Sequence, residues 1–143
     1  PLRLTLGGGM AVQRAVAERW KAATGVPLIE AYGLTETSPA ACINPMDLED
    51  YNGAIGLPIP STECKVIDAE GNEVSTGEPG ELCIRGPQVM KGYLNDPEAT
   101  AHTIDDDGWL HSGDVGFIDE DGHLTIVDRV KELIKFKGFT VQQ

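Results

Sequence analysis

Residues 32–39, YGLTETSP, place an aromatic ring, a glycine, a hydroxyl and a carboxylate in one short segment. The ring of Tyr32 can cover the face of a purine, and Gly33 allows the backbone to approach a ligand closely. Thr35 and Glu36 can hold a phosphate oxygen and the magnesium ion that accompanies it. The same residues also fit a core tyrosine at a strand end, followed by a helix cap with a favourably placed carboxylate. The segment therefore indicates a nucleotide site only in combination with other residues.

A second group of candidate residues follows in WLHSGDVG (109–116) and at Arg129. A carboxylate such as Asp114 can accept hydrogen bonds from both hydroxyls of a ribose. The guanidinium of Arg129 offers five fixed donors, which suit ribose hydroxyls with a phosphate close by. Asp114 after Gly113 also fits an ordinary turn aspartate.

Gly7, Gly8 and Gly9 lie between a predicted strand and the start of a predicted helix. Three glycines permit close backbone approach to a planar ligand, and the amides at a helix N-terminus favour anions. The alternative is a flexible tight turn without a ligand.

The segment DRVKELIKFKGF (128–139) is charged and fits an exposed connection between two domains. A hinge needs a few residues that are free to change φ and ψ, and such a run provides them. The alternative is a charged edge hairpin that turns at Gly138.

An α/β arrangement is predicted for the first part of the chain. Residues 2–6 predict a strand, and residues 10–24 predict an amphipathic helix because apolar side chains recur at helical spacing. Gly25 and Pro27 follow in the order that ends a helix. Residues 28–32 predict the next strand, and the strand–helix–strand order indicates α/β layering.

The pattern changes near residue 60 to short β segments separated by turn sequences. One helix is predicted at 97–103, with Asn95 or Asp96 as its cap before a proline at the first helical position. A third piece begins after Asp128. The predicted divisions are 1–60 (the end of an α/β subdomain), 61–127 (a small, mostly antiparallel β subdomain) and 128–143 (a hinge and the start of another domain).

Composition excludes several classes of partner. The net charge of −12 over 143 residues argues against nucleic acid, because no basic patch is present to displace counterions. No apolar run approaches the ~20 residues of a membrane span. Three widely spaced cysteines favour reduced, buried thiols in the cytoplasm, and no histidine stands near one of them in sequence to activate it. The three histidines lack metal-ligand spacing, so solvated or packed side chains are expected.

Together these motifs resemble the adenylate-forming superfamily of acyl-CoA synthetases, luciferases and adenylation domains. GGGMAVQ, EAYGLTETSPA and YNGAIGLPIPST are most similar to bacterial long-chain fatty-acid-CoA ligases. GELCIRGPQVMKGYLNDPEAT (80–100) resembles a structural signature of fatty-acyl and coumarate-CoA ligases, and DRVKELIKFKGF resembles coumarate-CoA ligases and luciferases. Thr140 departs from the glutamine that aryl-acid enzymes usually have there, which favours a fatty acid as the substrate.

The resemblance implies a fold and a set of roles. The chain would hold the C-terminal part of a large N-terminal domain, an α/β layer followed by a small β-barrel-like subdomain, and the start of a small α+β C-terminal domain. The glycine loop would border the adenine and acyl pockets, and Lys131 would be the hinge. Lys135 would face the thioester-forming half-reaction. The remaining roles are adenine stacking by Tyr32 beside Gly33, phosphate contact by Thr35, magnesium binding by Glu36, and ribose binding by Asp114 and Arg129.

The implied reaction is ATP-dependent activation of a carboxylic acid to an acyl-adenylate, followed by thioester formation with coenzyme A. ATP or AMP, Mg²⁺ and CoA would be its cofactors and co-substrates. Because the family's phosphate loop and C-terminal lysine are not in the sequence, we expect an internal fragment that is inactive alone. Its parent is expected to be cytoplasmic, peripheral at a membrane, and a homodimer. Two alternatives stay open: a peptide-synthetase-type adenylation domain or luciferase-like enzyme, and a non-catalytic nucleotide-binding or interaction fragment.

Overall fold

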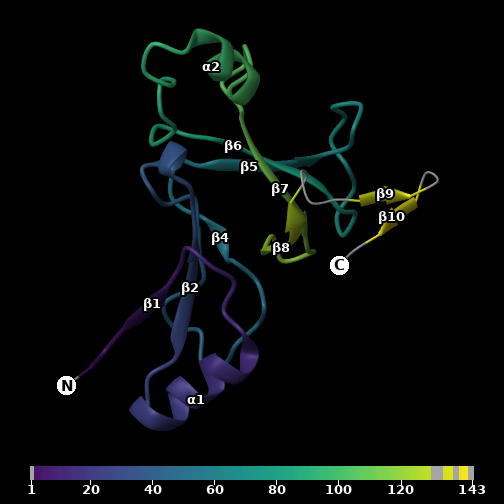
Figure 1. The fold of residues 1–143 in the computed structure, drawn as a ribbon. Coiled ribbons are helices and arrows are strands. Elements are labelled where there is room, and N and C mark those ends of the chain that lie inside the picture. Colours follow the sequence, from purple (N-terminus) through teal and green to yellow (C-terminus); the bar gives the residue numbers. More distant parts are fainter. Residues whose placement is uncertain (1, 130–133, 137–138, 142–143) are drawn as a thin grey trace.

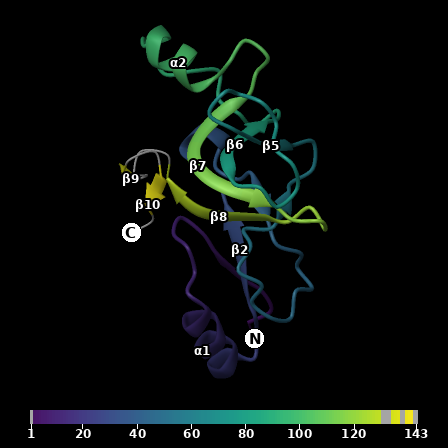
Figure 2. The same cartoon turned by 90° about the vertical axis from the view of Figure 1, so that its right-hand side faces the viewer.

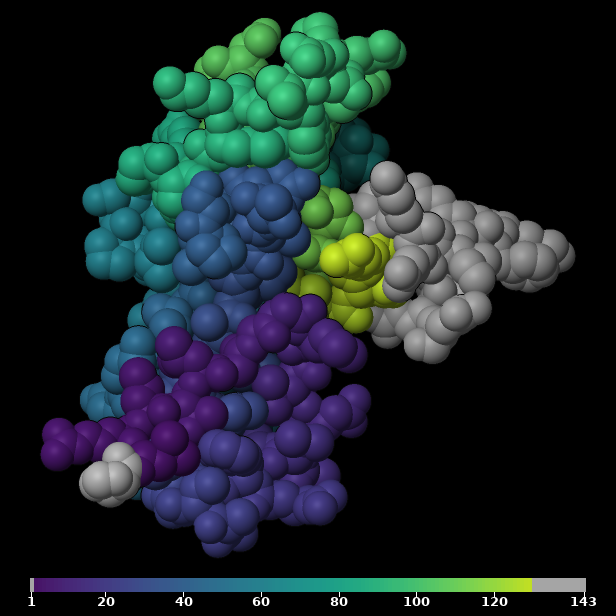
Figure 3. Space-filling model, turned by 60° about the vertical axis from the view of Figure 1, so that its left-hand side comes forward, coloured from purple at the N-terminus to yellow at the C-terminus, as the bar shows by residue number. Residues whose placement is uncertain are grey.

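The computed structural model describes residues 2–129, 134–136 and 139–141. It contains two four-stranded sheets, with helix α1 at one end of the molecule and helix α2 at the other (Figure 1). In the space-filling view, the N-terminal part (purple to blue) and the region around α2 (green) likewise lie at opposite ends (Figure 3). This confirms an α/β chain with an additional β-rich part.

The first sheet is formed by four short strands in the order β1-β2-β3-β4. Strand β1 pairs in parallel with β2, and helix α1 connects them, whereas β3 and β4 are added antiparallel. The bounds are β1 Thr5–Gly7, α1 Arg14–Thr24, β2 Leu28–Tyr32, β3 Cys42–Ile43 and β4 Leu57–Pro58.

The prediction for 28–32 is confirmed, and Gly25 ends α1 in the left-handed region with φ of 74°. The predicted helix start at residue 10 is wrong, because α1 begins at Arg14. The backbone of Val12 is held by tertiary contacts instead: its N–H donates to Glu30 Oε1 at 3.3 Å, and its carbonyl accepts from the Tyr51 hydroxyl at 2.8 Å. These bonds hold this segment outside the helix. Strand β1 likewise lies at 5–7 and not at 2–6.

The second sheet is antiparallel throughout, in the order β5-β6-β7-β8. Figure 2 shows the long strand β7 curving across this sheet. Leu82, Ile84, Leu110 and Leu124 from this sheet pack with Cys42 from the first sheet in one core. The two sheets therefore share a core. The bounds are β5 Glu63–Ile67, β6 Gly80–Arg85, β7 Leu110–Ile118 and β8 Leu124–Arg129.

Helix α2 spans Pro97–Thr103, as predicted. Of the two cap candidates, Asp96 is the one used, because its Oδ1 accepts from the backbone N–H of Ala99 at 2.9 Å. Asn95 instead adopts a positive φ of 55° in the preceding turn.

The chain's last described strands, β9 (Ile134–Phe136) and β10 (Phe139–Val141), pair antiparallel, with Phe136 opposite Phe139. The segment 128–139 therefore includes β9, one strand of an antiparallel pair, in agreement with the alternative prediction of an edge hairpin. Lys131 and Gly138 lie outside the described residues, and Lys135 lies on β9. No helix in the described part of the chain could cross a membrane; the longest, α1, has 11 residues.

Candidate active site

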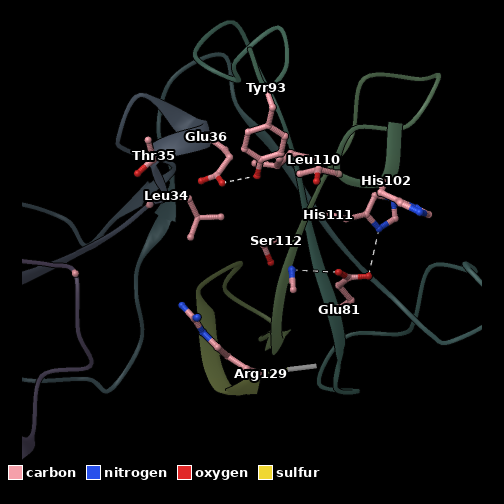
Figure 4. Close-up of a pocket in the computed structure, with 14 residues that line it drawn as sticks. Leu34, Thr35, Glu36, Glu81, Tyr93, His102, Leu110, His111, Ser112 and Arg129 are labelled. Carbon is pink, nitrogen blue, oxygen red and sulfur yellow. Dashed lines mark hydrogen bonds and ion pairs between the residues drawn. The ribbon is translucent and has the colours of Figure 1, made fainter. Parts of the chain in front are cut away.

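A cavity of about 970 Å³ opens between the two sheets and helix α2 (Figure 4). Five of the predicted site residues line it: Gly9, Gly33, Thr35, Glu36 and Arg129. The other lining residues come from the loop after β2, from strands β6 and β7, and from the segment around α2. They are Leu34, Glu81, Tyr93, His102, Thr103, Leu110, His111, Ser112 and Gly113. The predicted residues that are not among those lining the cavity are Gly7, Gly8, Tyr32 and Asp114.

Tyr32, Asp114 and Arg129 are joined directly to one another. The Tyr32 hydroxyl donates to Asp114 Oδ2 at 2.5 Å, and Arg129 Nε lies 3.0 Å from Asp114 Oδ1. Asp114 is 4% exposed, while the Arg129 side chain is 64% exposed. Burial raises the pKa of Tyr32, and the hydrogen bond to the Asp114 carboxylate raises it further. The structure thus brings together three predicted residues behind the cavity, with Arg129 reaching its wall.

Asp114 lies in the middle of strand β7 rather than in a turn. Its Cα pairs with that of Arg129 on β8, so the strand register itself sets the two side chains side by side. Its backbone N–H donates to Ser112 Oγ at 3.1 Å, and that hydroxyl donates to the Leu82 carbonyl at 2.7 Å. The N–H of Gly113 donates to Glu81 Oε1 at 3.1 Å. The contacts to Leu82 and Glu81 on β6 and the pairing with Arg129 on β8 therefore hold the backbone that carries the carboxylate.

Glu36 lies on the 3₁₀ turn η1 (Thr35–Thr37) and faces the cavity. Its Oε1 accepts from the Tyr93 hydroxyl at 2.6 Å, and its carbonyl accepts from Met90 N–H at 2.8 Å. Figure 4 shows Glu36 and Tyr93 on the same side of the cavity. A carboxylate oxygen is the kind of ligand that Mg²⁺ takes beside substrate phosphates, usually from only one or two carboxylates. The Glu36 carboxylate at the cavity is therefore of the kind that could bind a Mg²⁺ ion carried by a phosphate group.

Of the three glycines at 7–9, the first two pack against β2 and the third lines the cavity. Gly7 belongs to β1 and pairs with Glu30, and a Cβ on Gly8 would lie 2.9 Å from the Ala31 carbonyl. Gly9, with φ of 82°, is the glycine of this run that lines the cavity. Because α1 begins at Arg14, the loop does not lead directly into a helix N-terminus.

Sequence reasoning missed the polar side chains on β6 and β7. His111 Nδ1 lies 3.2 Å from Glu81 Oε2 and 3.7 Å from Cys83 Sγ. Burial raises the pKa of the Cys83 thiol to about 12, and the Glu81 charge adds to the shift. A histidine that is distant in sequence thus lies beside Cys83 in the folded chain. Linear spacing carries no signal for this contact, because it arises from the pairing of Cys83 with His111 across two strands.

Tyr93 was also missed. It lies in GELCIRGPQVMKGYLNDPEAT, a segment in which sequence reasoning found no chemistry. The turn before α2 brings it to Glu36, 57 residues away in sequence. Its role becomes visible only in the folded chain.

The chain is an α/β protein with a cavity lined by polar side chains, and sequence comparison identifies its family. A family model described as "AMP-binding enzyme" matches residues 1–94, so the chain belongs to the AMP-binding enzyme family. A long-chain-fatty-acid–CoA ligase of Escherichia coli O157:H7 is 56% identical over 140 residues, which cover 98% of this chain and 25% of that protein. A 4-coumarate–CoA ligase of Vanilla planifolia is 54% identical over 119 residues, covering 78% of this chain and 21% of the relative.

Comparison with solved structures also finds similar proteins. ATP-bound MatB from Rhodopseudomonas palustris matches with a TM-score of 0.90 and 37% identity, covering 97% of this chain and 28% of that one. The resemblance to long-chain fatty-acid-CoA ligases and to coumarate-CoA ligases is thereby confirmed. The chain spans about a quarter of the length of the curated relatives that it matches.

Proposed function

We propose that these residues form the adenosine-binding part of an ATP-dependent acid–CoA ligase that acts on a fatty acid. The observation that carries the proposal is the Tyr32–Asp114–Arg129 group, joined by a hydrogen bond and an ion pair, at a cavity of about 970 Å³. The chain is similar to a long-chain-fatty-acid–CoA ligase over 98% of its length, and this similarity supports a fatty acid over an aryl acid as the substrate. The substrate carboxylate would attack the α-phosphorus of ATP and release pyrophosphate. The thiol of coenzyme A would then displace AMP.

In this proposal Asp114 and Arg129 hold the ribose. An ionised carboxylate offers about four acceptor positions, of which the hydroxyl of Tyr32 and the guanidinium of Arg129 each use one. Two positions thus remain for the ribose hydroxyls. The exposed side chain of Arg129 can turn aside to admit the sugar at little cost, and can then donate to a hydroxyl or a phosphate oxygen.

Tyr32 would keep its hydroxyl on Asp114 while one face of its ring covers adenine, beside Gly33 and Gly9. Thr35 would contact phosphate from the exposed start of η1, and Glu36 would hold Mg²⁺. Bound magnesium would neutralise phosphate charge during both half-reactions. Gly7 and Gly8 would support this wall through their packing on β2, leaving Gly9 to approach the ligand.

The proposal also covers the division of the chain, the roles of two lysines, and the assembly and location of the complete protein. The chain would divide at 1–60, 61–127 and 128–143, with 61–127 barrel-like and the small C-terminal domain beginning at the hinge Lys131. Lys135 would face the CoA half-reaction. The complete protein would be a cytoplasmic homodimer that meets its substrates at the membrane surface. It would use no nucleic-acid partner, in keeping with the charge of −12.

A thermal-shift measurement with a non-hydrolysable acyl-adenylate analogue tests the proposal. We expect the analogue to raise the Tm of this chain and of Asp121→Ala, in which an exposed carboxylate on the β7–β8 turn is removed. Asp114→Asn keeps the shape of the buried side chain, and we expect it to melt cooperatively without a ligand-induced shift. Equal shifts in Asp114→Asn and the parent chain would refute ribose binding by Asp114. Failure of a full-length protein to exchange pyrophosphate into ATP would favour a non-catalytic nucleotide-binding role.

A further inference from the structure

Glu81, Cys83 and His111 form a compact cluster on one face of the second sheet, beside the cavity. Glu81 and Cys83 are two residues apart on β6, and their ligand atoms lie on the same side although the register with β7 shifts between them. His111 pairs directly with Cys83 from β7. The three ligand atoms, a carboxylate oxygen, a thiol sulfur and an imidazole nitrogen, all lie within 4.8 Å of one another.

The spacing of these atoms matches that of a tetrahedral metal centre. Bonds of about 2.0–2.3 Å to Zn²⁺ place neighbouring ligands about 3.3–3.8 Å apart. His111 Nδ1 lies 3.2 Å from Glu81 Oε2 and 3.7 Å from Cys83 Sγ. The third distance, from Glu81 to Cys83, is at most 4.8 Å, so small rotations of the half-buried Glu81 and His111 side chains would bring all three ligand atoms onto one ion. Glu81 and His111 line the cavity, which leaves the fourth position open to it.

Two outer contacts would orient these ligands. The second nitrogen of His111, Nε2, lies 3.7 Å from Asp105 Oδ2, which is beyond hydrogen-bond distance but close enough for this carboxylate to take the place that carboxylates commonly have behind metal-bound imidazoles. The second oxygen of Glu81, Oε1, accepts from the Gly113 N–H at 3.1 Å, so Oε2 remains for a metal. Both outer contacts involve atoms that would not bind the metal, namely His111 Nε2 and Glu81 Oε1.

The local charges also favour a cation. The carboxylates of Glu81 and Asp105 flank His111, at 3.2 Å from Nδ1 and 3.7 Å from Nε2. A thiol that coordinates a divalent ion loses its proton outright. The sulfur would then form a metal–thiolate bond, and its proton would pass to the buffer.

We propose that Glu81, Cys83 and His111 bind a thiophilic divalent cation of the Zn²⁺ type, with the open coordination position facing the cavity. Mixed sulfur and nitrogen ligands select Zn²⁺ or Co²⁺ over Mg²⁺, which takes oxygen. This site is separate from the magnesium position assigned to Glu36. It does not depend on the proposed ligase function, since the ion needs no nucleotide.

Titration of this chain with Co²⁺ under reducing, chelator-free conditions tests the site. We expect one equivalent to bind with a thiolate-to-cobalt charge-transfer band, and Zn²⁺ but not excess Mg²⁺ to remove the band. Cys83→Ser should abolish it, and His111→Gln should weaken Co²⁺ binding at least about tenfold. Asp105→Asn should weaken binding by about 10- to 100-fold, as losses of outer-shell partners do.

The controls use groups of the same kind elsewhere in the fold. Cys64→Ser removes a thiol that contacts Cys42 at 3.9 Å, and His123→Gln removes a histidine beside Asp119, so both should retain the band. Because Cys83 is fully buried, far-ultraviolet circular dichroism checks each variant, and His111→Gln tests the site with the thiol intact. The proposal is overturned if no band appears at millimolar Co²⁺, if Cys83→Ser retains it, or if Cys64→Ser abolishes it.

Discussion

Replacing Tyr32 with phenylalanine removes one hydroxyl and keeps the ring. That hydroxyl makes the 2.5 Å bond to Asp114 and links β2 of the first sheet to β7 of the second, across 82 residues of sequence. Asp114 is 4% exposed, so water has little access to replace the lost donor. Arg129 at 3.0 Å remains as the other partner of the carboxylate.

A hydrogen bond to a charged group contributes about 1.5–3 kcal/mol to stability. We therefore expect Tyr32→Phe to lower the free energy of unfolding by about 1.5–3 kcal/mol. At roughly 3–4 °C per kcal/mol for a domain of this size, Tm should fall by about 5–12 °C. Urea unfolding followed by circular dichroism measures the first quantity, and a thermal scan measures the second. Because the ring is kept, the variant should retain a Tm shift with the acyl-adenylate analogue, unlike Asp114→Asn.

Tyr93→Phe is the matched control. Tyr93 also donates its hydroxyl to a carboxylate, Glu36, at 2.6 Å, but its side chain is 38% exposed and water can take the place of the lost donor. We expect its cost to stay below about 1 kcal/mol. Equal losses in the two variants, or no loss in Tyr32→Phe, would refute the argument that burial of Asp114 makes this bond important.

Two further predictions concern pH and backbone packing. The pKa of Tyr32 is raised above its ordinary value of 10.0, so the folded chain keeps a proton that the unfolded chain loses, and stability should fall as pH rises above about 10. Urea unfolding between pH 9 and 11 should show a shallower decline for Tyr32→Phe than for the parent chain, whereas parallel curves would contradict the assignment. Gly33→Ala should cost at least about 2 kcal/mol, since the new Cβ would lie 1.7 Å from the Pro39 carbonyl oxygen. Gly7→Ala, whose Cβ would meet the side chains of Leu28 at 3.2 Å and Val12 at 3.3 Å but no backbone atom that close, should cost clearly less in the same urea assay, and equal costs would contradict the packing argument.

Local sequence determined the elements whose signals are contained within a few residues. The strand at 28–32, the end of α1 at Gly25, and the helix at 97–103 were all predicted, with the cap of that helix narrowed to Asn95 or Asp96. In each case the deciding interaction is a turn, a cap or a short periodic run. The motif around residues 32–36 and the signature at 80–100 likewise identified the family from sequence alone.

Local signals did not determine where α1 begins. Residues 10–13 have helical periodicity, but Glu30 and Tyr51 bond the backbone of Val12 from other parts of the chain. Two specific hydrogen bonds outweigh a weak helical preference of a few tenths of a kcal/mol per residue. Tertiary contact therefore fixed this boundary.

The site was decided by strand pairing between distant segments. The sequence named Asp114 and Arg129 as paired ribose contacts and Tyr32 as a separate candidate. The antiparallel register of β7 and β8 sets Asp114 beside Arg129, and only the contact of the two sheets brings Tyr32 to them. The same holds for Cys83 and His111, whose spacing in sequence carries no metal signature. Side-chain types are written in the sequence, whereas their distances depend on a register that local propensity does not encode.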